Sequence, residues 1–131
     1  MISVNKAKQL KKLGLVWIPK CGDWYKADYW PTATLLTADT TRMDNEEIKG
    51  VFERIGKDDK TVWLPRLDQL LNEIEKFNVY WEIERLLEDN KPFYSVIIGE
   101  IPMDRGNSNI LEDAIADALI WILEKKVGKI N

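Results

Sequence analysis

Residues 61–84 read TVWLPRLDQLLNEIEKFNVYWEIE, and the periodicities in this stretch decide the class of fold. Thr61 to Leu64 have the β-branched and aromatic character of a strand, and Pro65 follows where the first turn of a helix tolerates it. Apolar residues then recur at helical spacing, at Leu67, Leu70, Leu71 and Ile74. A period of two follows, with Val79, Trp81 and Ile83 alternating with Tyr80, Glu82 and Glu84. The stretch therefore predicts a strand, a helix and a second strand with one buried face.

The chain after this stretch predicts one more strand and a long helix. Residues Glu88 to Pro92 are typical of a turn, and Phe93 to Ile101 is apolar on both sides, which favours an inner strand covered from both faces. Pro102 to Asn109 is polar and is predicted to be a loop. The last helix has acidic residues at its start, Lys125 and Lys126 near its end, and a broad apolar face that includes Ala114 and Ala118.

The chain before this stretch begins with a predicted helix. Ser3 is a suitable N-cap for an apolar series that runs from Val4 to Leu13, and Gly14 is suited to end it. Leu15 to Ile18 and Trp24 to Tyr29 are predicted to form the two strands of a hairpin. The threonine-rich stretch from Thr32 to Thr41 fits an edge strand and an extended loop equally well.

A further helix is predicted over residues 45–55. Asp44 and Glu47 have the spacing of a capping box, and Met43 is placed to pack onto Ile48 across that cap. Apolar residues follow at i, i+3, i+4 and i+7, and Gly56 is suited to close the helix. The alternative is a strand from Val51 to Gly56 that pairs with residues 61–64.

Length and charge indicate one domain and limit its partners. A chain of 131 residues with 45% apolar residues is the usual size and composition of a single domain, here 1–131. The net charge of −3 argues against general nucleic-acid binding, and the lysines of the first helix are interpreted as a solvated face. A single cysteine, no secretory signal and no apolar run near the ~20 residues of a membrane span favour a cytoplasmic location.

No catalytic apparatus is recognisable. The sequence contains no histidine, which excludes Ser-His-Asp and Cys-His arrangements, and one cysteine is too few for a zinc site built from cysteine and histidine. The acidic pairs Asp58–Asp59 and Glu88–Asp89 are interpreted as solvated charge, and Glu82 and Glu84 as an exposed strip on one strand face. Cys21 is interpreted as an inert thiol. The sequence therefore predicts no catalytic residue, metal or cofactor, with enzyme activity the less favoured option.

Aromatic residues are the most suggestive feature, since six tryptophans in this length is a high number. Trp63, Trp81 and Trp121 lie in periodic apolar patterns and are predicted to be core residues. The candidate binding residues lie in turn-rich sequence and are Lys20, Asp23, Trp24, Tyr25, Tyr29 and Trp30. Exposed aromatics of this kind anchor protein interfaces or stack on ligands. The alternative is that they plug one end of the sheet.

The order of motifs from Trp63 onward resembles a known family. The run Trp63-Leu-Pro-Arg-Leu-Asp68 precedes an amphipathic helix, the strands Tyr80–Glu84 and Phe93–Ile97 follow, and Glu112–Leu119 opens an Ala-rich helix. This order resembles the small phage and prophage proteins of the "ABA sandwich" group, which also have an upstream aromatic segment like Trp17 to Tyr25. The helix at 45–55 departs from that pattern. The resemblance implies a sheet between helices and carries no activity or site.

We therefore expect an α+β fold with a mainly antiparallel sheet packed between helices, similar to an α/β/α sandwich. The expected function is that of a non-catalytic phage or prophage accessory protein that binds another protein or forms a homodimer. The alternative is a small-molecule or nucleotide-binding domain whose aromatic-lined pocket uses Lys20, Lys26 and Asp23 to orient the ligand.

Overall fold

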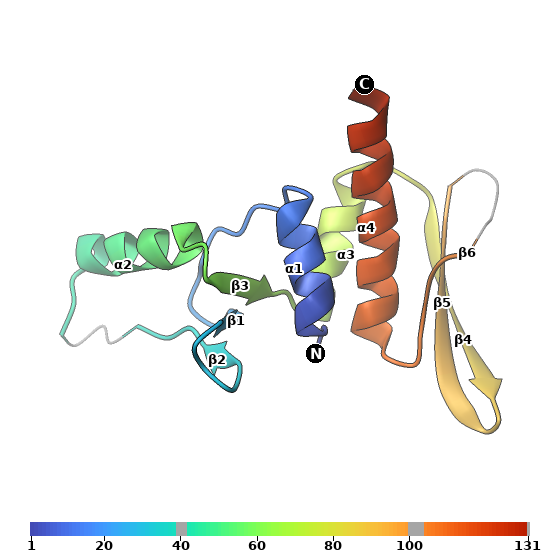
Figure 1. Ribbon diagram of the computed structural model, residues 1–131, viewed down its shortest axis with the longest axis horizontal. Helices are drawn as coiled ribbons and strands as arrows, with labels where there is room; N and C mark the ends of the chain where they lie inside the picture. The colour runs from blue at the N-terminus through green and yellow to red at the C-terminus, as the bar shows by residue number, and fades with distance from the viewer. Residues whose placement is uncertain (39–41, 100–103, 131) are drawn as a thin grey trace.

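The computed structural model of the chain contains four helices and two three-stranded antiparallel sheets in the part that it describes (Figure 1). It describes residues 1–38, 42–99 and 104–130, with the backbone alone for residues 104, 105 and 126–130. Helices and antiparallel strands occupy separate stretches of the chain, which confirms the predicted α+β class.

Three of the described helices form the middle of the molecule, with one sheet on either side (Figure 1). The long helix α4 contacts strands β5 and β6 on one side, and helices α1 and α3 on the other. The bounds of these helices are α1 Val4–Lys12, α3 Leu67–Glu75 and α4 Leu111–Ile130. As predicted, Ser3 caps α1 by accepting a hydrogen bond from the backbone N–H of Lys6, and Gly14, at φ 97°, follows its end.

The sheet beside α4 has the strand order β4-β5-β6, with bounds Trp81–Glu88, Lys91–Ile98 and Asp104–Ser108. Strands β4 and β5 form a hairpin in which Trp81 pairs with Ile98 and Glu88 with Lys91. Asp89 and Asn90 close it, both at positive φ (51° and 63°), as a two-residue type I′ turn requires.

The second sheet has the order β2-β1-β3 and lies on the other side of α1. Its strands are β1 Trp24–Ala27, β2 Thr34–Leu35 and β3 Thr61–Leu64, all antiparallel to their neighbours. Val62 and Leu64 are buried against the central helices. Helix α2, Asn45–Lys57, contacts β3 and extends from this end of the molecule (Figure 1).

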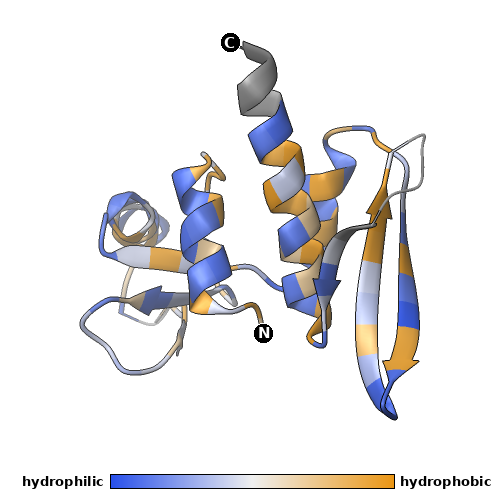
Figure 2. Ribbon diagram, turned by 45° about the vertical axis from the view of Figure 1, so that its right-hand side comes forward, coloured by the Kyte–Doolittle hydropathy of each residue, from blue (hydrophilic) through white to orange (hydrophobic). Residues whose placement is uncertain are grey.

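Small residues let α4 approach its sheet closely. Ala114 and Ala118 are fully buried, and Val96 and Ile98 of β5 are buried in the same core. An ideal Cβ built on Gly106 of β6 would lie 2.0 Å from the carbonyl oxygen of Ala114, so only glycine fits at that position. Hydrophobic residues run along α4 and onto the facing strands (Figure 2).

Several sequence-based expectations differ from the structure. The strands divide between two sheets with the helices between them, where one sheet between helices was expected. Strand β5 is central in its sheet, and α4 covers its Val96 side, but none of the described helices covers its other side. The polar segment expected to be a loop contains β6, and residues 100–103 lie outside the described part of the chain.

The N-terminal hairpin prediction was wrong. Residues 15–20 form no strand, and β1 pairs with β2 and β3 instead.

The helix predicted at 45–55 is confirmed as α2, and its strand alternative is excluded. Asp44 caps this helix by accepting a hydrogen bond from the N–H of Glu47 at 2.8 Å. Within the described chain, none of the helices has the length and apolar character needed to span a membrane.

Candidate functional site

Five aromatic rings form a continuous array on one face of the β2-β1-β3 sheet, which we call the aromatic cluster. Its members are Trp63, Trp17, Tyr25, Trp30 and Tyr29, in spatial order. Trp63 and Trp17 are stacked, with ring centroids 6.4 Å apart and planes within 6°. The remaining contacts have centroid distances of 5.8, 6.1 and 5.6 Å. Each distance lies within the range in which aromatic rings attract each other.

The alternation of strand β1 decides which aromatic residues join this cluster. Tyr25 lies opposite Trp63 in the register of the sheet, so both side chains point to the same face. Trp24 lies opposite Leu64 and points to the other face, where it packs against the hydrophobic core. Trp24 therefore lies apart from the aromatic cluster, on the opposite face of the sheet.

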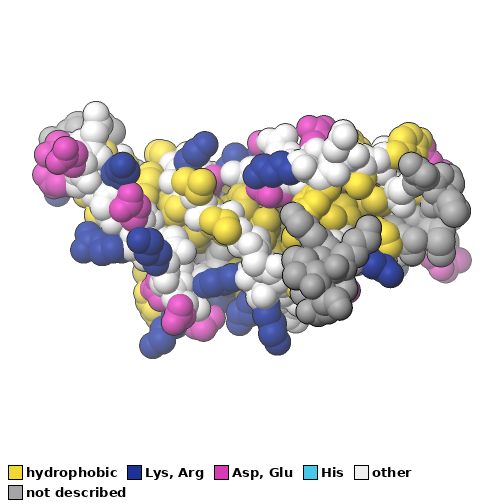
Figure 3. Space-filling view, turned by 90° about the horizontal axis from the view of Figure 1, so that it is seen from above, with side chains coloured by type: hydrophobic (Ala, Val, Ile, Leu, Met, Phe, Trp, Pro, Cys, Tyr) yellow, Lys and Arg dark blue, Asp and Glu magenta, His cyan; other side chains and the backbone are white. Residues whose placement is uncertain are grey.

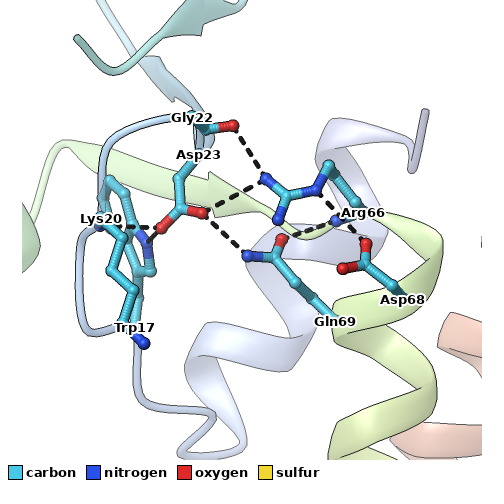
Figure 4. Close-up of polar contacts among 7 residues, drawn as sticks. All are labelled: Trp17, Lys20, Gly22, Asp23, Arg66, Asp68 and Gln69. Atoms are coloured by element: carbon cyan, nitrogen blue, oxygen red, sulfur yellow. Dashed lines mark hydrogen bonds and ion pairs between the residues drawn. The ribbon is translucent and has the colours of Figure 1, made fainter.

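Asp23 holds the segment before β1 against helix α3 (Figure 4). One carboxylate oxygen accepts hydrogen bonds from Trp17 Nε1 and from the backbone N–H of Lys20, both at 2.9 Å. The other accepts from Gln69 Nε2 at 2.8 Å and faces the guanidinium of Arg66 at 3.4 Å. The side chain is only 3% exposed, so its four donors fill its bonding capacity and make Asp23 a structural centre.

A turn after β1 presents the exposed end of the cluster. The N–H of Trp30 donates to the carbonyl of Ala27 at 3.1 Å, and Lys26 Nζ donates to the carbonyl of Trp30 at 2.8 Å. These bonds fix the backbone that carries Tyr29 and Trp30, whose side chains are 64% and 39% exposed. Tyr25, beneath them, is buried, and this burial together with nearby Tyr29 raises the pKa of Tyr25.

Two cavities border the other end of the cluster, and Trp17 and Trp63 line both. One, of about 220 Å³, lies between α1, the end of α2 and β3. The second, of about 260 Å³, lies between Val16–Ile18 and the residues of α3 that face them. Trp63 Nε1 is buried without a hydrogen-bond partner in the described structure, whereas Trp17 Nε1 is bound to Asp23.

The structure thus assembles part of the predicted site. It brings Tyr25, Tyr29 and Trp30 together, places Lys20 at the surface, and buries Asp23 as a structural residue. Sequence analysis did not include Trp17 and Trp63 in the site. The exact register of β1 with β3 places Trp63 opposite Tyr25, and the sequence does not specify that register.

The acidic residues considered in the sequence lie elsewhere. Glu82 and Glu84 share the face of β4 away from α4, and Glu82 accepts a hydrogen bond from the Tyr80 hydroxyl at 2.7 Å, which raises the pKa of Tyr80. Asp58 accepts from the N–H of Lys60 in the turn before β3. Cys21 is free and exposed. Among the described residues, no three acidic or cysteine side chains are grouped closely enough to hold a metal ion.

Comparison with known proteins places the chain in no group: no family model, no curated protein and no solved structure matches it.

Proposed function

We propose that this protein is a non-catalytic accessory protein that acts by binding another protein through the exposed end of its aromatic cluster. The observation that carries the proposal is the exposure of two large rings, Tyr29 and Trp30, at 64% and 39%, on a support of buried side chains. Tyrosine and tryptophan are the residues most enriched among those that dominate binding energy at protein interfaces.

The side chains beneath these rings lower the conformational entropy that is lost on binding. Tyr25 contacts the ring of Trp30, and Trp30 contacts Tyr29 nearly edge-on, at an interplanar angle of 81°. Lys26 and Ala27 hold the turn backbone through the hydrogen bonds described above. A side chain that is already ordered loses little conformational entropy when a partner covers it, so more of the contact energy remains as affinity.

The small-molecule alternative has less support from the geometry. The two cavities lined by the aromatic cluster, about 220 and 260 Å³, are smaller than the roughly 300–1,000 Å³ of typical small-molecule sites. Two of the three groups expected to orient a ligand are also engaged within the protein, because Asp23 has four donors and Lys26 Nζ binds backbone carbonyls. The phage or prophage origin is part of this proposal and rests on the sequence resemblance alone.

The experiment is affinity capture from a lysate of the organism that encodes the protein. The tagged native protein is compared with the double variant Tyr29→Ala/Trp30→Ala. Tyr80→Ala is the matched control, because Tyr80 is 57% exposed and lies just before β4, outside the aromatic cluster. We expect a partner that the native protein and the control retain and the folded double variant loses. A partner retained equally by all three proteins would refute the proposal.

A further inference from the structure

Residues 16–18, between α1 and β1, form an exposed segment without secondary structure. Val16 and Ile18 are each 73% exposed, whereas Trp17 between them is half-buried in the aromatic cluster. Alternation of exposed and covered side chains with a period of two is typical of an extended chain. The two most exposed branched aliphatic side chains in the described structure therefore lie on one extended segment.

The backbone of this segment is unpaired. The N–H and C=O groups of Val16, Trp17 and Ile18 make no hydrogen bond with any described residue. The segment is anchored by its neighbours instead, since the N–H of Leu15 donates to the carbonyl of Leu10 and that of Lys20 donates to Asp23. Unpaired extended backbone with branched side chains is the usual template for addition of another strand.

The side on which a strand can add follows from the direction of one carbonyl. The carbonyl oxygen of Trp17 lies on the α2 side, 3.5 Å from an ideal Cβ on Gly56. In an extended chain, neighbouring residues direct their backbone groups to opposite sides. In an extended segment, the backbone groups of Val16 and Ile18 would therefore lie opposite those of Trp17, on the side of α3, where the 260 Å³ cavity is open.

The groove has two different walls and a charged end. Val16 to Ile18 form one wall, Asn72 and the ion pair Glu73–Lys76 lie on the α3 side, and the indoles of Trp17 and Trp63 complete the apolar lining. The Asp23 carboxylate also lines the groove and is paired with Arg66. Lys20 lines the same groove, is exposed, and makes no ion pair with a described residue. A carboxylate on the occupant complements this lysine.

We propose that an extended peptide segment of the partner protein, carrying an acidic residue, adds as a β-strand to Val16–Ile18 in the groove beside α3. Val16 and Ile18 together offer it two donors and two acceptors, an apolar side chain of the peptide packs on the two indoles, and its carboxylate pairs with Lys20. This inference rests on the proposed function, because the groove lies at the other end of the aromatic cluster that the same partner covers.

The same segment of a second copy does not pair with Val16–Ile18 in this groove. In each copy, Trp17 anchors the segment to the sheet, and α3 lies beside it. A segment whose side chain is held in this way against its own fold is not free to lie along the same segment of another copy. The occupant is therefore a free extended segment, such as a terminus or a loop of another protein.

The test uses a random heptapeptide display library selected against the intact native protein. The synthetic form of an enriched peptide is then titrated before and after single backbone N-methylations, introduced one position at a time. N-methylation removes one N–H and leaves the side chains and the protein unchanged. We expect enriched peptides to carry an acidic residue. We also expect N-methylation at alternate positions to weaken peptide affinity at least tenfold, and N-methylation at the positions between them to change the affinity less than about twofold.

A pair of protein variants tests the same backbone hydrogen bonds from the side of the protein. Val16→Pro removes one of the two N–H groups that face the groove, whereas Val16→Thr keeps that N–H and the branched side chain. We expect a tenfold or greater loss of peptide affinity for the proline variant, a change of less than about threefold for the threonine variant, and two-state melting of both.

Three results would overturn the inference: no enriched peptide, equal tolerance of N-methylation at every position, or a dimer of the native protein that Val16→Pro abolishes. These failures are distinguishable from failure of the proposed function. If partner capture still depends on Tyr29 and Trp30, the protein-binding function stands and only strand addition is refuted. If capture is independent of both rings, the proposed function is refuted whatever the peptides do.

Discussion

Trp17 and Trp63 provide a matched comparison of a paired and an unpaired buried indole. Their rings are stacked and both are half-buried, so replacement by phenylalanine removes a similar amount of packing from each. Trp17 Nε1 donates to the buried carboxylate of Asp23 at 2.9 Å, whereas Trp63 Nε1 has no partner in the described structure. The two substitutions therefore differ mainly in one hydrogen bond.

The size of that difference follows from the environment of Asp23. A hydrogen bond to a charged group contributes about 1.5–3 kcal/mol, and Asp23 at 3% exposure cannot recruit water freely when Trp17 is lost. Removal of Trp63 Nε1 instead eliminates an unsatisfied donor, which is nearly neutral or slightly favourable. We expect Trp17→Phe to lower the free energy of unfolding by about 2 kcal/mol more than Trp63→Phe does.

The assay is urea unfolding followed by far-UV circular dichroism, with the free energies compared at equal m-values. Trp63→Phe serves as the packing control for Trp17→Phe. Equal destabilisation by the two variants, or a larger loss from Trp63→Phe, would show that the hydrogen bond to Asp23 does not stabilise this part of the fold.

Two further predictions concern packing and pH. Gly106→Ala should destabilise the protein by about 3 kcal/mol, because its Cβ would clash with the backbone of Ala114, whereas Gly50→Ala in α2, with open space around it, should stabilise the protein by up to about 1 kcal/mol. Chemical denaturation of both variants checks this, and an unchanged stability of Gly106→Ala would contradict the close packing of β6 on α4. Burial and nearby Tyr29 raise the pKa of Tyr25 above its ordinary value near 10, so the neutral form is favoured in the folded state and stability should fall as the pH rises above about 10. Thermal melts between pH 8 and 11 should show a smaller fall for Tyr25→Phe, and identical pH profiles would refute that assignment.

Local signals in the sequence predicted the helices well. The cap at Asp44, the apolar stripe of α3 and the small residues of α4 each depend on neighbours within one or two helical turns, and all three helices are present. The hairpin turn at Asp89 and Asn90 was also apparent, because that residue type tolerates positive φ.

Features that depend on distant contacts were not predictable in the same way. The pattern Leu15–Ile18 has strand-like composition, but β1 pairs instead with β2 and with β3. The first residue of β3, Thr61, lies 34 positions after Ala27, the last residue of β1. Strand β6 is polar and contains a glycine, which predicts a loop; it is a strand because Gly106 lets the backbone lie directly against α4. The composition of neither segment specifies these contacts.

The candidate site also combines features that depend on local sequence with features that depend on distant contacts. The turn composition around Tyr29 and Trp30 left open whether these rings are exposed or plug one end of the sheet, and in the structure they are 64% and 39% exposed. The burial of Asp23 depends on Arg66 and Gln69, which lie more than forty positions away in the chain. The sequence therefore singled out the aromatic residues of the turn, whereas the hydrogen bonds that hold Asp23 depend on residues far away in the chain.

The measurement that tests the central claim most directly is a calorimetric titration of the captured partner into the native protein and into Tyr29→Ala/Trp30→Ala. Aromatic residues that anchor an interface contribute about 2 kcal/mol or more each, so the account predicts a loss of affinity of at least about 100-fold with an unchanged melting temperature. An affinity for the folded double variant equal to that of the native protein would contradict the claim that the partner binds the exposed end of the aromatic cluster.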